Sequence, residues 1–142
     1  MKIFIVFMGL LVINVSFLSY QGDMNQFVRQ QAILKFLAEE CAASAAALMD
    51  EKEYAKGRMV FDQERGEGHV EDFLQYTMAT WGFKGQLSCK LDFEDDQMGY
   101  PDENTQEIPA VSARIRYETE DLFQLPFITL TQLERKARYQ LE

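Results

Sequence analysis

Residues 3–20 read IFIVFMGLLVINVSFLSY, an apolar run that follows Lys2 and precedes an acidic chain. About 20 apolar residues in a helix span the core of a bilayer, whereas 10–14 do not. The run therefore predicts either a retained membrane anchor or a cleaved secretory signal. Residues 14–22 offer no good pair of small residues for a signal cleavage site, which favours the anchor. We expect Lys2 to keep the N-terminus in the cytoplasm, with the rest of the chain outside the cell membrane.

Composition predicts one folded domain behind this anchor. The chain has 142 residues, 47% of them hydrophobic and 13% aromatic. We therefore assign residues 1–22 to a membrane anchor and residues 23–142 to a single extracytoplasmic domain whose core needs no cofactor. A formal charge of −9 argues against a nucleic-acid partner, because a phosphate-binding surface needs clustered Lys and Arg.

Helical periodicity continues after the apolar run, from Asp23 to about Lys56. Apolar residues recur every seven positions and further small or apolar residues fill the same face: Phe27, Leu34, Leu37, Ala38, Cys41, Ala45 and Leu48. Either the apolar run continues into this helix as one rod, or a joint at Gly22 lets Asp23 cap a new helix. Residues 41–47 are small on every side, which permits close approach of a neighbouring helix or reflects high helix propensity alone.

After Gly57 the pattern breaks into shorter elements. Residues 58–62 read as a short extended piece, and residues 63–68 as a polar turn with two glycines. A second helix is expected from about His69 to Thr80, closed by Gly82 just past its end.

The period then changes from 3.6 to 2. Apolar and polar residues alternate in residues 86–93 and 111–117, with opposite charges on the polar faces. A third strand is expected to begin at Ile128 and Leu130, with a bulge near Thr131 and Gln132 to reconcile its phase. The sequence thus predicts an α+β fold made of a long N-terminal helix, one short helix and a three-stranded antiparallel sheet.

The two cysteines, Cys41 and Cys89, both fall on predicted apolar faces. In an exported domain they can form a disulfide. They are equally compatible with two buried free thiols that act as small hydrophobic residues.

Residues typical of catalysis are scarce. His69 is the single histidine and lies beside Glu71 and Asp72, without the second His or the spaced Cys that a metal site needs. The sequence has no phosphate-binding glycine loop, nucleophile elbow or zinc-protease motif, so we expect no enzyme. The best ligand candidate is an acidic loop suited to Ca²⁺, although a solvated strand connection explains it equally well: Asp92, Glu94, Asp95, Asp96, Asp102, Glu103 and Asn104.

Several stretches carry a resemblance to a known family. They are the alanine-rich segment from QA at 31–32 to AASAA at 42–46, DEKEY at 50–54 with GRMVFD at 57–62, and the closing VSARI at 111–115, DLFQLPF at 121–127 and RKARY at 135–139. Together with the apolar leader, these resemble the TadE-like minor pseudopilins of tight-adherence (Flp) pili of the Gram-positive type. The resemblance implies a pilin-like, non-catalytic subunit whose partners are other pilus subunits and an assembly platform.

The chain departs from that family at its leader. Prepilins are usually cut after a glycine that follows a basic leader, with a glutamate five residues further on. Here Gly9 is followed at that distance by Asn14, and the leader carries only Lys2. An uncut chain of this kind is expected to be an anchored assembly or initiating component rather than the bulk filament.

Two functional hypotheses follow. In the first, rods pack side by side in the membrane through Phe27, Leu34, Leu37, Cys41, Ala45 and Leu48, although burial against the chain's own sheet explains the distal residues as well. In the second, the domain is a secreted or membrane-tethered binding module of the cell envelope. That module would need an exposed aromatic cluster, for which Trp81, Tyr100 and Tyr117 are available.

Overall fold

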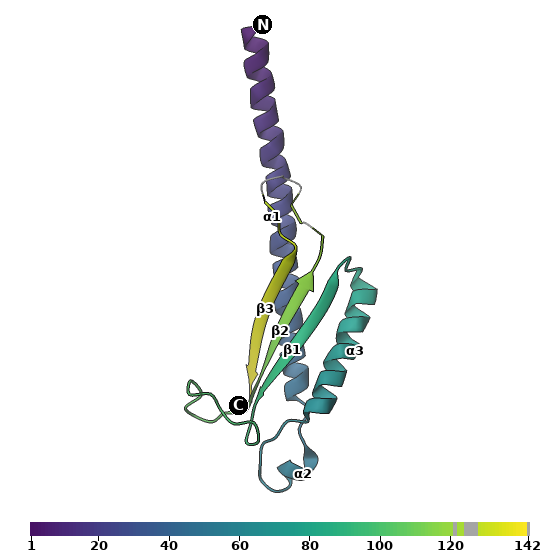
Figure 1. Ribbon diagram of the computed structural model, residues 1–142, viewed down its shortest axis with the longest axis vertical. Coiled ribbons are helices and arrows are strands. Elements are labelled where there is room, and N and C mark those ends of the chain that lie inside the picture. The colour runs from purple at the N-terminus through teal and green to yellow at the C-terminus, as the bar shows by residue number, and fades with distance from the viewer. Residues whose placement is uncertain (121, 124–127, 142) are drawn as a thin grey trace.

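The computed structural model describes residues 1–120, 122–123 and 128–141. Its elements are the helices α1 (Lys2–Ala46), α2 (Glu51–Tyr54) and α3 (Gln63–Trp81), and the strands β1 (Gln86–Glu94), β2 (Ala110–Glu118) and β3 (Gln132–Gln140). Figure 1 shows a long rod, α1, whose N-terminal half projects alone and whose other half lies along the sheet, with α3 beside it. The predicted α+β fold with a long helix and a three-stranded antiparallel sheet is confirmed.

The rod is unbroken at Gly22, so the one-rod alternative is the correct one. It ends at Ala46, earlier than the predicted end near Lys56. The chain turns away there because residues 48–50 pair with residues 60–62. Asp50 N–H donates to the Val60 carbonyl at 2.9 Å, and Asp62 N–H donates to the Leu48 carbonyl at 2.9 Å. α2 is a separate short helix, capped by the Asp50 carboxylate, which accepts from Lys52 N–H at 2.8 Å.

α3 begins at Gln63, so the predicted polar turn over residues 63–68 is wrong. The Asp62 carboxylate caps this helix by accepting from Arg65 N–H at 3.1 Å. Gly66 is buried within the first turns, where a Cβ would lie 3.6 Å from that of Ala45. The glycine thus marks a close approach of two helices rather than a turn. The predicted glycine stop is confirmed, because Gly82 is left-handed with φ 66°.

The sheet has the order β1-β2-β3, with both pairs antiparallel. β1 and β2 match the predicted strands within a residue. β3 starts at Gln132, so the predicted start at Ile128 is wrong. No bulge is needed, because the pairing from Gln132 to Gln140 is one to one and places Leu133 opposite Tyr117 on the buried face. The preceding residues instead close the connection between β2 and β3, where Thr119 N–H donates to the Thr131 carbonyl at 2.9 Å.

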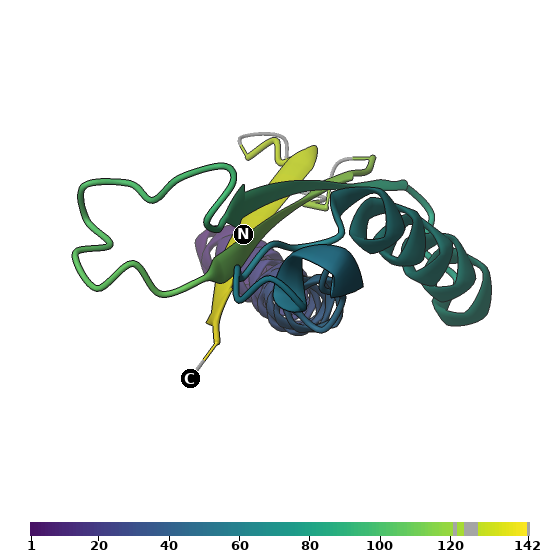
Figure 2. The ribbon, with the colours of Figure 1, turned by 90° about the horizontal axis from the view of Figure 1, so that it is seen from below.

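The head has two layers. Seen from below in Figure 2, α1 and α3 lie on the same side of the sheet, with α3 next to its β1 edge. The covered face supplies the core, including Val111, Ala113 and Ile115, which have no exposed surface. The opposite face is polar, and there Arg116 on β2 pairs with Glu134 on β3 at 3.3 Å. Between β1 and β2, Lys90 instead lies opposite Arg114, so the predicted pairing of opposite charges across these two strands is not seen there. Of the closing stretch at 121–127, Asp121 and residues 124–127 lie outside the described residues.

Candidate membrane-anchor and assembly surface

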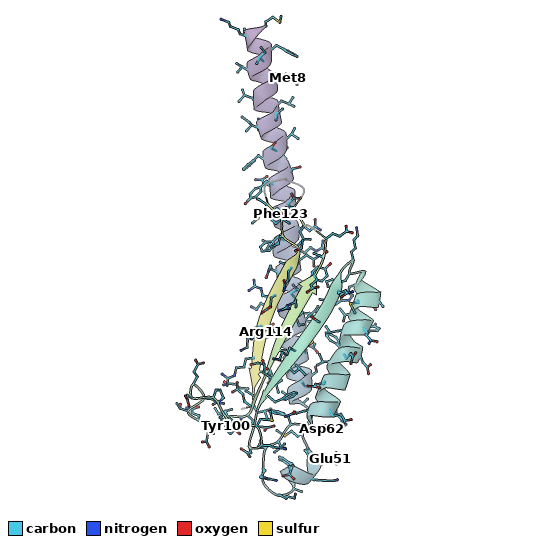
Figure 3. All side chains as sticks on the ribbon, viewed as in Figure 1. Met8, Glu51, Asp62, Tyr100, Arg114 and Phe123 are labelled. Atoms are coloured by element: carbon cyan, nitrogen blue, oxygen red, sulfur yellow. The ribbon has the colours of Figure 1, made fainter. Side chains whose placement is uncertain are left out.

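The N-terminal half of α1 is an apolar cylinder with no cover. Figure 3 shows its side chains, Met8 among them, projecting on all sides of the helix. Within the part of the chain that the structure describes, α1 is the one helix long and apolar enough to cross a membrane, and none of its most apolar stretch is buried. At ~1.5 Å per residue, residues 3–20 span about 27 Å, close to the thickness of a bilayer core.

Polar side chains inside this cylinder bond back to the helix. The Asn14 side-chain amide donates to the Leu10 carbonyl at 2.8 Å, and the Ser16 hydroxyl donates to the Val12 carbonyl at 2.9 Å. Such bonds to the preceding turn satisfy polar groups where no water is available. Asn14 is exposed, and its side chain has a second amide hydrogen and an oxygen, which gives the apolar half a polar contact point.

The head meets the rod directly after the apolar run. Phe123, in the connection between β2 and β3, packs against α1 with ring centroids 6.4 Å from Tyr20 and 6.3 Å from Phe27. Figure 3 shows Phe123 at the point where the strands end beside the helix. Asp23, 6% exposed, is the first buried residue of the described chain. The change from bare to covered helix therefore falls within one turn of Gly22.

The residues predicted to pack rods together lie instead inside the head. Leu34, Leu37, Cys41 and Ala45 have no exposed surface. Phe27 and Leu48 are partly buried, and Leu48 lies beyond the end of α1. The reason is that the apolar face of the sheet needs a cover, and this stripe of α1 supplies it. In this structure these side chains are therefore not free to contact a neighbouring rod.

The alanine-rich stretch also has an intramolecular role. Ala38, Ala42, Ala45 and Ala46 are at most 1% exposed, and their small side chains let α1 lie close to the sheet and to α3. On the outward side of the same helix, Val28 and Phe36 are about half exposed. These outward residues, together with the apolar half, form the surface of α1 that remains open to a partner.

The aromatic residues proposed for a binding module separate into different environments. Tyr117 is buried, whereas Trp81 at the end of α3 is 50% exposed. Trp81 stacks between Phe36 and Phe83, with centroid distances of 6.3 Å and 6.4 Å. Tyr100 lies apart on the acidic loop, where its hydroxyl donates to the Asp96 carboxylate at 2.8 Å. The sequence identified Trp81 but gave no sign that Phe36, from α1, would join it.

The two carboxylates at the start of the acidic loop, buried Asp95 and exposed Asp96, both accept from backbone N–H groups. Asp95 is fully buried, and it accepts from the N–H groups of Phe61, Gln97 and Met98 at 3.0, 2.9 and 2.8 Å. Asp96 accepts from Met59 N–H at 2.7 Å. Both therefore fasten this loop to the chain segment between α2 and α3. Among the described residues, no group of three or more His, Cys, Asp or Glu is placed to hold a metal ion.

Further residues predicted for a site lie in separate parts of the head. His69 is exposed on α3. Cys41 on α1 is buried and Cys89 on β1 is half-buried, and both are free thiols. Asn104 closes the far end of the acidic loop by donating to the Ile108 carbonyl at 2.8 Å.

Two structurally important residues had no clear sequence signal. Asp95 looks like one of several loop acids, yet it is the one that is buried. Gly85 precedes β1, and a Cβ at this position would lie 1.9 Å from the Glu118 carbonyl oxygen. Only glycine fits so close to the paired strand. Its position directly before an alternating strand was the one available hint.

Comparison of the chain with known protein families, curated proteins and solved structures finds no significant match.

Proposed function

We propose that this chain is a non-catalytic structural or assembly component of the cell envelope, a minor subunit built like a pilin. One observation carries the proposal: a single unbroken helix, Lys2–Ala46, is bare and apolar in its first half and forms the core of a small head in its second. The resemblance to TadE-like pseudopilins supports the same conclusion. The partners would be other pilin-like subunits and an assembly platform.

The exposed apolar half needs a non-aqueous environment. Fully burying one large apolar side chain is worth about 1.5–3 kcal/mol, and residues 3–18 expose most of their apolar side chains. A bilayer, or a bundle of such rods, supplies that burial, whereas water does not. Lys2 before the run and the acidic head behind it support a single pass with the N-terminus in the cytoplasm and the head outside.

Contacts between rods would form through the residues that the head leaves uncovered. These are the apolar half with Asn14, followed by Val28 and Phe36 on the outward side of the lower helix. Amide side chains within membrane helices form hydrogen bonds to neighbouring helices, worth about 0.6–2 kcal/mol each. The stripe from Leu34 to Ala45, which was predicted to contact other rods, is covered by the chain's own sheet.

The first test is the N-terminal sequence of the mature protein recovered from membranes. An uncut chain supports the anchored assembly component, and a chain cut after Gly9 supports processing as a pilin. A freely soluble protein that begins near Gly22 would contradict the proposal, because the rod would then have been removed.

A second test locates the contact between copies. A photoactivatable cross-linking residue at Ile13, which is 66% exposed, should yield covalent oligomers in cells. The matched control is the same residue at Tyr76, which is 67% exposed but lies on α3 of the head and not on the apolar half of the rod. Equal cross-linking from both positions would contradict contact through the apolar half.

A binding module of the cell envelope is the second candidate, favoured by the exposed stack of Trp81 on Phe36. Tryptophan is enriched at binding interfaces, so an exposed stack of this kind would suit an envelope polymer or a peptide. Because Trp81 is the only tryptophan, its fluorescence would report binding directly. A saturable change on addition of cell-wall fragments, lost in Trp81→Ala and retained in Tyr76→Ala, would support this candidate over the first.

A further inference from the structure

The sheet has two outer edges, β1 and β3, and only one of them is protected against a further strand. On β3, Arg135 lies opposite the buried Ile115, so a charge occupies the covered face at this edge. Its guanidinium donates to the Gln31 side chain of α1. Lys136, the next residue, is exposed. Inward-pointing charges and edge lysines prevent another strand from pairing with a sheet edge, so β3 is a closed edge.

The edge strand β1 lacks this protection. Its residues on the covered face, from Leu87 to Phe93, are all uncharged. Its single lysine, Lys90, lies on the polar face, where the Asp92 carboxylate is 4.0 Å from the Lys90 ammonium group. All nine residues of β1 pair with β2 along the inner side, and the outer side has no strand partner among the described residues. Alternate N–H and C=O groups of β1 therefore point outward, free to pair.

A groove runs along this open edge. It is a cavity of about 560 Å³ between β1 and α3, a size typical of ligand sites. Five consecutive residues of β1, 87–91, line it. Because neighbouring side chains of a strand point to opposite faces, a cavity lined by consecutive residues follows the edge of the strand rather than one face. Figures 1 and 2 show α3 beside this edge, where it forms the other wall.

The wall that α3 contributes is apolar inside and acidic at the rim. Val70 and Leu74 are buried, and Met78 is half-buried, at helical spacing along the cavity. Glu67 and Glu71, one turn apart, are exposed at its rim. In the part of the chain that the structure describes, neither carboxylate has an ion-pair partner. The groove thus combines open backbone groups, an apolar wall and uncompensated negative charge.

We propose that the outer edge of β1 is a docking site for an extended segment of another envelope subunit, apolar at alternate positions and carrying Lys or Arg. The segment would add a fourth strand to the sheet by pairing with the backbone of β1. Its apolar side chains would enter the groove against Leu74 and Leu91, and its cations would face Glu67 and Glu71. The class of partner, another subunit of the assembly, rests on the proposed function.

A single extended segment fits this edge better than a whole second head does. The β3 edge of another copy is closed by Arg135 and Lys136. Two β1 edges would pair as an antiparallel, two-fold contact. Because the strands run along the rod, as Figure 1 shows, that contact would point the two rods in opposite directions. Rods inserted in one membrane with the same orientation cannot form it.

The experiment uses the purified full chain in a nonionic detergent and a synthetic nine-residue peptide in which valine alternates with lysine and threonine. Hydrogen–deuterium exchange is measured with and without the peptide. At saturation the peptide should slow exchange of the amides of β1 at least about fivefold and leave those of β3 unchanged. No slowing in β1, or equal slowing in β3, would overturn the proposal.

Two control peptides test the chemistry of the segment. With glutamate in place of each lysine, binding should be at least about tenfold weaker, because the rim of the groove is acidic. With proline in place of two valines, the peptide loses backbone donors and should no longer protect β1. Undiminished binding of the proline peptide would show that no strand is added, and it would overturn the proposal.

A pair of neighbouring variants tests where the cations of the peptide lie. Glu71→Lys should weaken peptide binding about three- to tenfold, because it replaces an attraction with a repulsion at the rim. Asp72→Lys makes the same change of charge at an exposed residue that does not line the groove, and it should stay within about twofold of the parent. Equal effects would contradict the placement over α3. The Tm of each variant confirms that the head is folded.

Two further outcomes separate this site from the proposed function. Concentration-dependent association of the chain without peptide, with slowed exchange in β1, would make a second copy the occupant and overturn the proposed partner. A mature chain that begins near Gly22 but still binds the peptide through β1 would contradict the anchored assembly component and leave the docking edge intact. An uncut chain in membranes that binds no peptide would overturn the docking edge alone.

Discussion

The two halves of α1 share one backbone conformation, but their surroundings are opposite. In the first half, Ile5 and Ile13 are each about two thirds exposed, whereas Leu34 and Leu37 in the second half have no exposed surface. The first half is apolar around its whole circumference, and the second is apolar along one stripe with charged residues opposite. A helix that is apolar all round needs lipid or other helices, whereas a striped one needs a single covering layer. The difference indicates that one rod serves two environments, and substitutions can test each half separately.

The largest effect is expected from Ala45→Arg, in the covered half. Ala45 has no exposed surface, and a charge buried there without a partner should cost about 3–5 kcal/mol of head stability. This is a large fraction of the stability of a small domain. Thermal unfolding followed by circular dichroism measures it. Ala32→Arg, on the exposed side of the same helix, is the control and should stay within about 0.5 kcal/mol of the parent.

A charge in the bare half should weaken membrane insertion and leave the stability of the head unchanged. Leu11→Arg places a charge at the centre of the apolar run, which should cost about 2.5–3.5 kcal/mol of membrane insertion. The head should melt at the same temperature as before, because Leu11 makes no contact with it. Carbonate extraction of membranes measures retention, and Leu11→Phe serves as the apolar control. A lowered Tm would mean that the two halves are not independent.

Two glycines test how closely the backbone is packed at two positions of the head. Gly85→Ala should lower stability by about 1–3 kcal/mol, because its Cβ would meet the backbone carbonyl of Glu118. Gly68→Ala, inside α3 with open space around it, should raise stability by about 0.5–1 kcal/mol. Chemical unfolding of both variants checks the two signs. Equal effects would show that the close approach at Gly85 is not formed.

The smallest effect concerns pH and the acidic loop. The pKa of Asp96 is lowered because Met59 N–H and the Tyr100 hydroxyl donate to its carboxylate. A lowered folded-state pKa contributes stability above the unfolded value of about 3.9, and this is lost as the pH falls through the folded value. Asp96→Ala should therefore lower the Tm slightly at pH 7 and progressively less as the pH falls below 4. A difference that grows on acidification would contradict this assignment.

Local patterns were sufficient to predict most of the elements. The alternation of apolar and polar residues placed β1 and β2 within a residue, and Gly82 ended α3 as expected. They failed where a distant contact sets a boundary. α1 ends at Ala46 because Leu48 and Asp50 bond to residues after α2, and Gly66, predicted to lie in a turn, lies inside α3 and packs on Ala45. Neither partner is visible in the local sequence.

The amino-acid sequence alone establishes that a helix without a polar face leads into an amphipathic helix, and that two strands follow with one apolar face each. These are properties of residue order, since side-chain direction repeats every 3.6 residues in a helix and every two in a strand. Tertiary packing alone sets what the stripe covers. The stripe that was predicted to contact other rods instead forms part of the core of the head. The apolar face of the sheet lies next to it in the same chain, and burying these two apolar surfaces against each other is favourable.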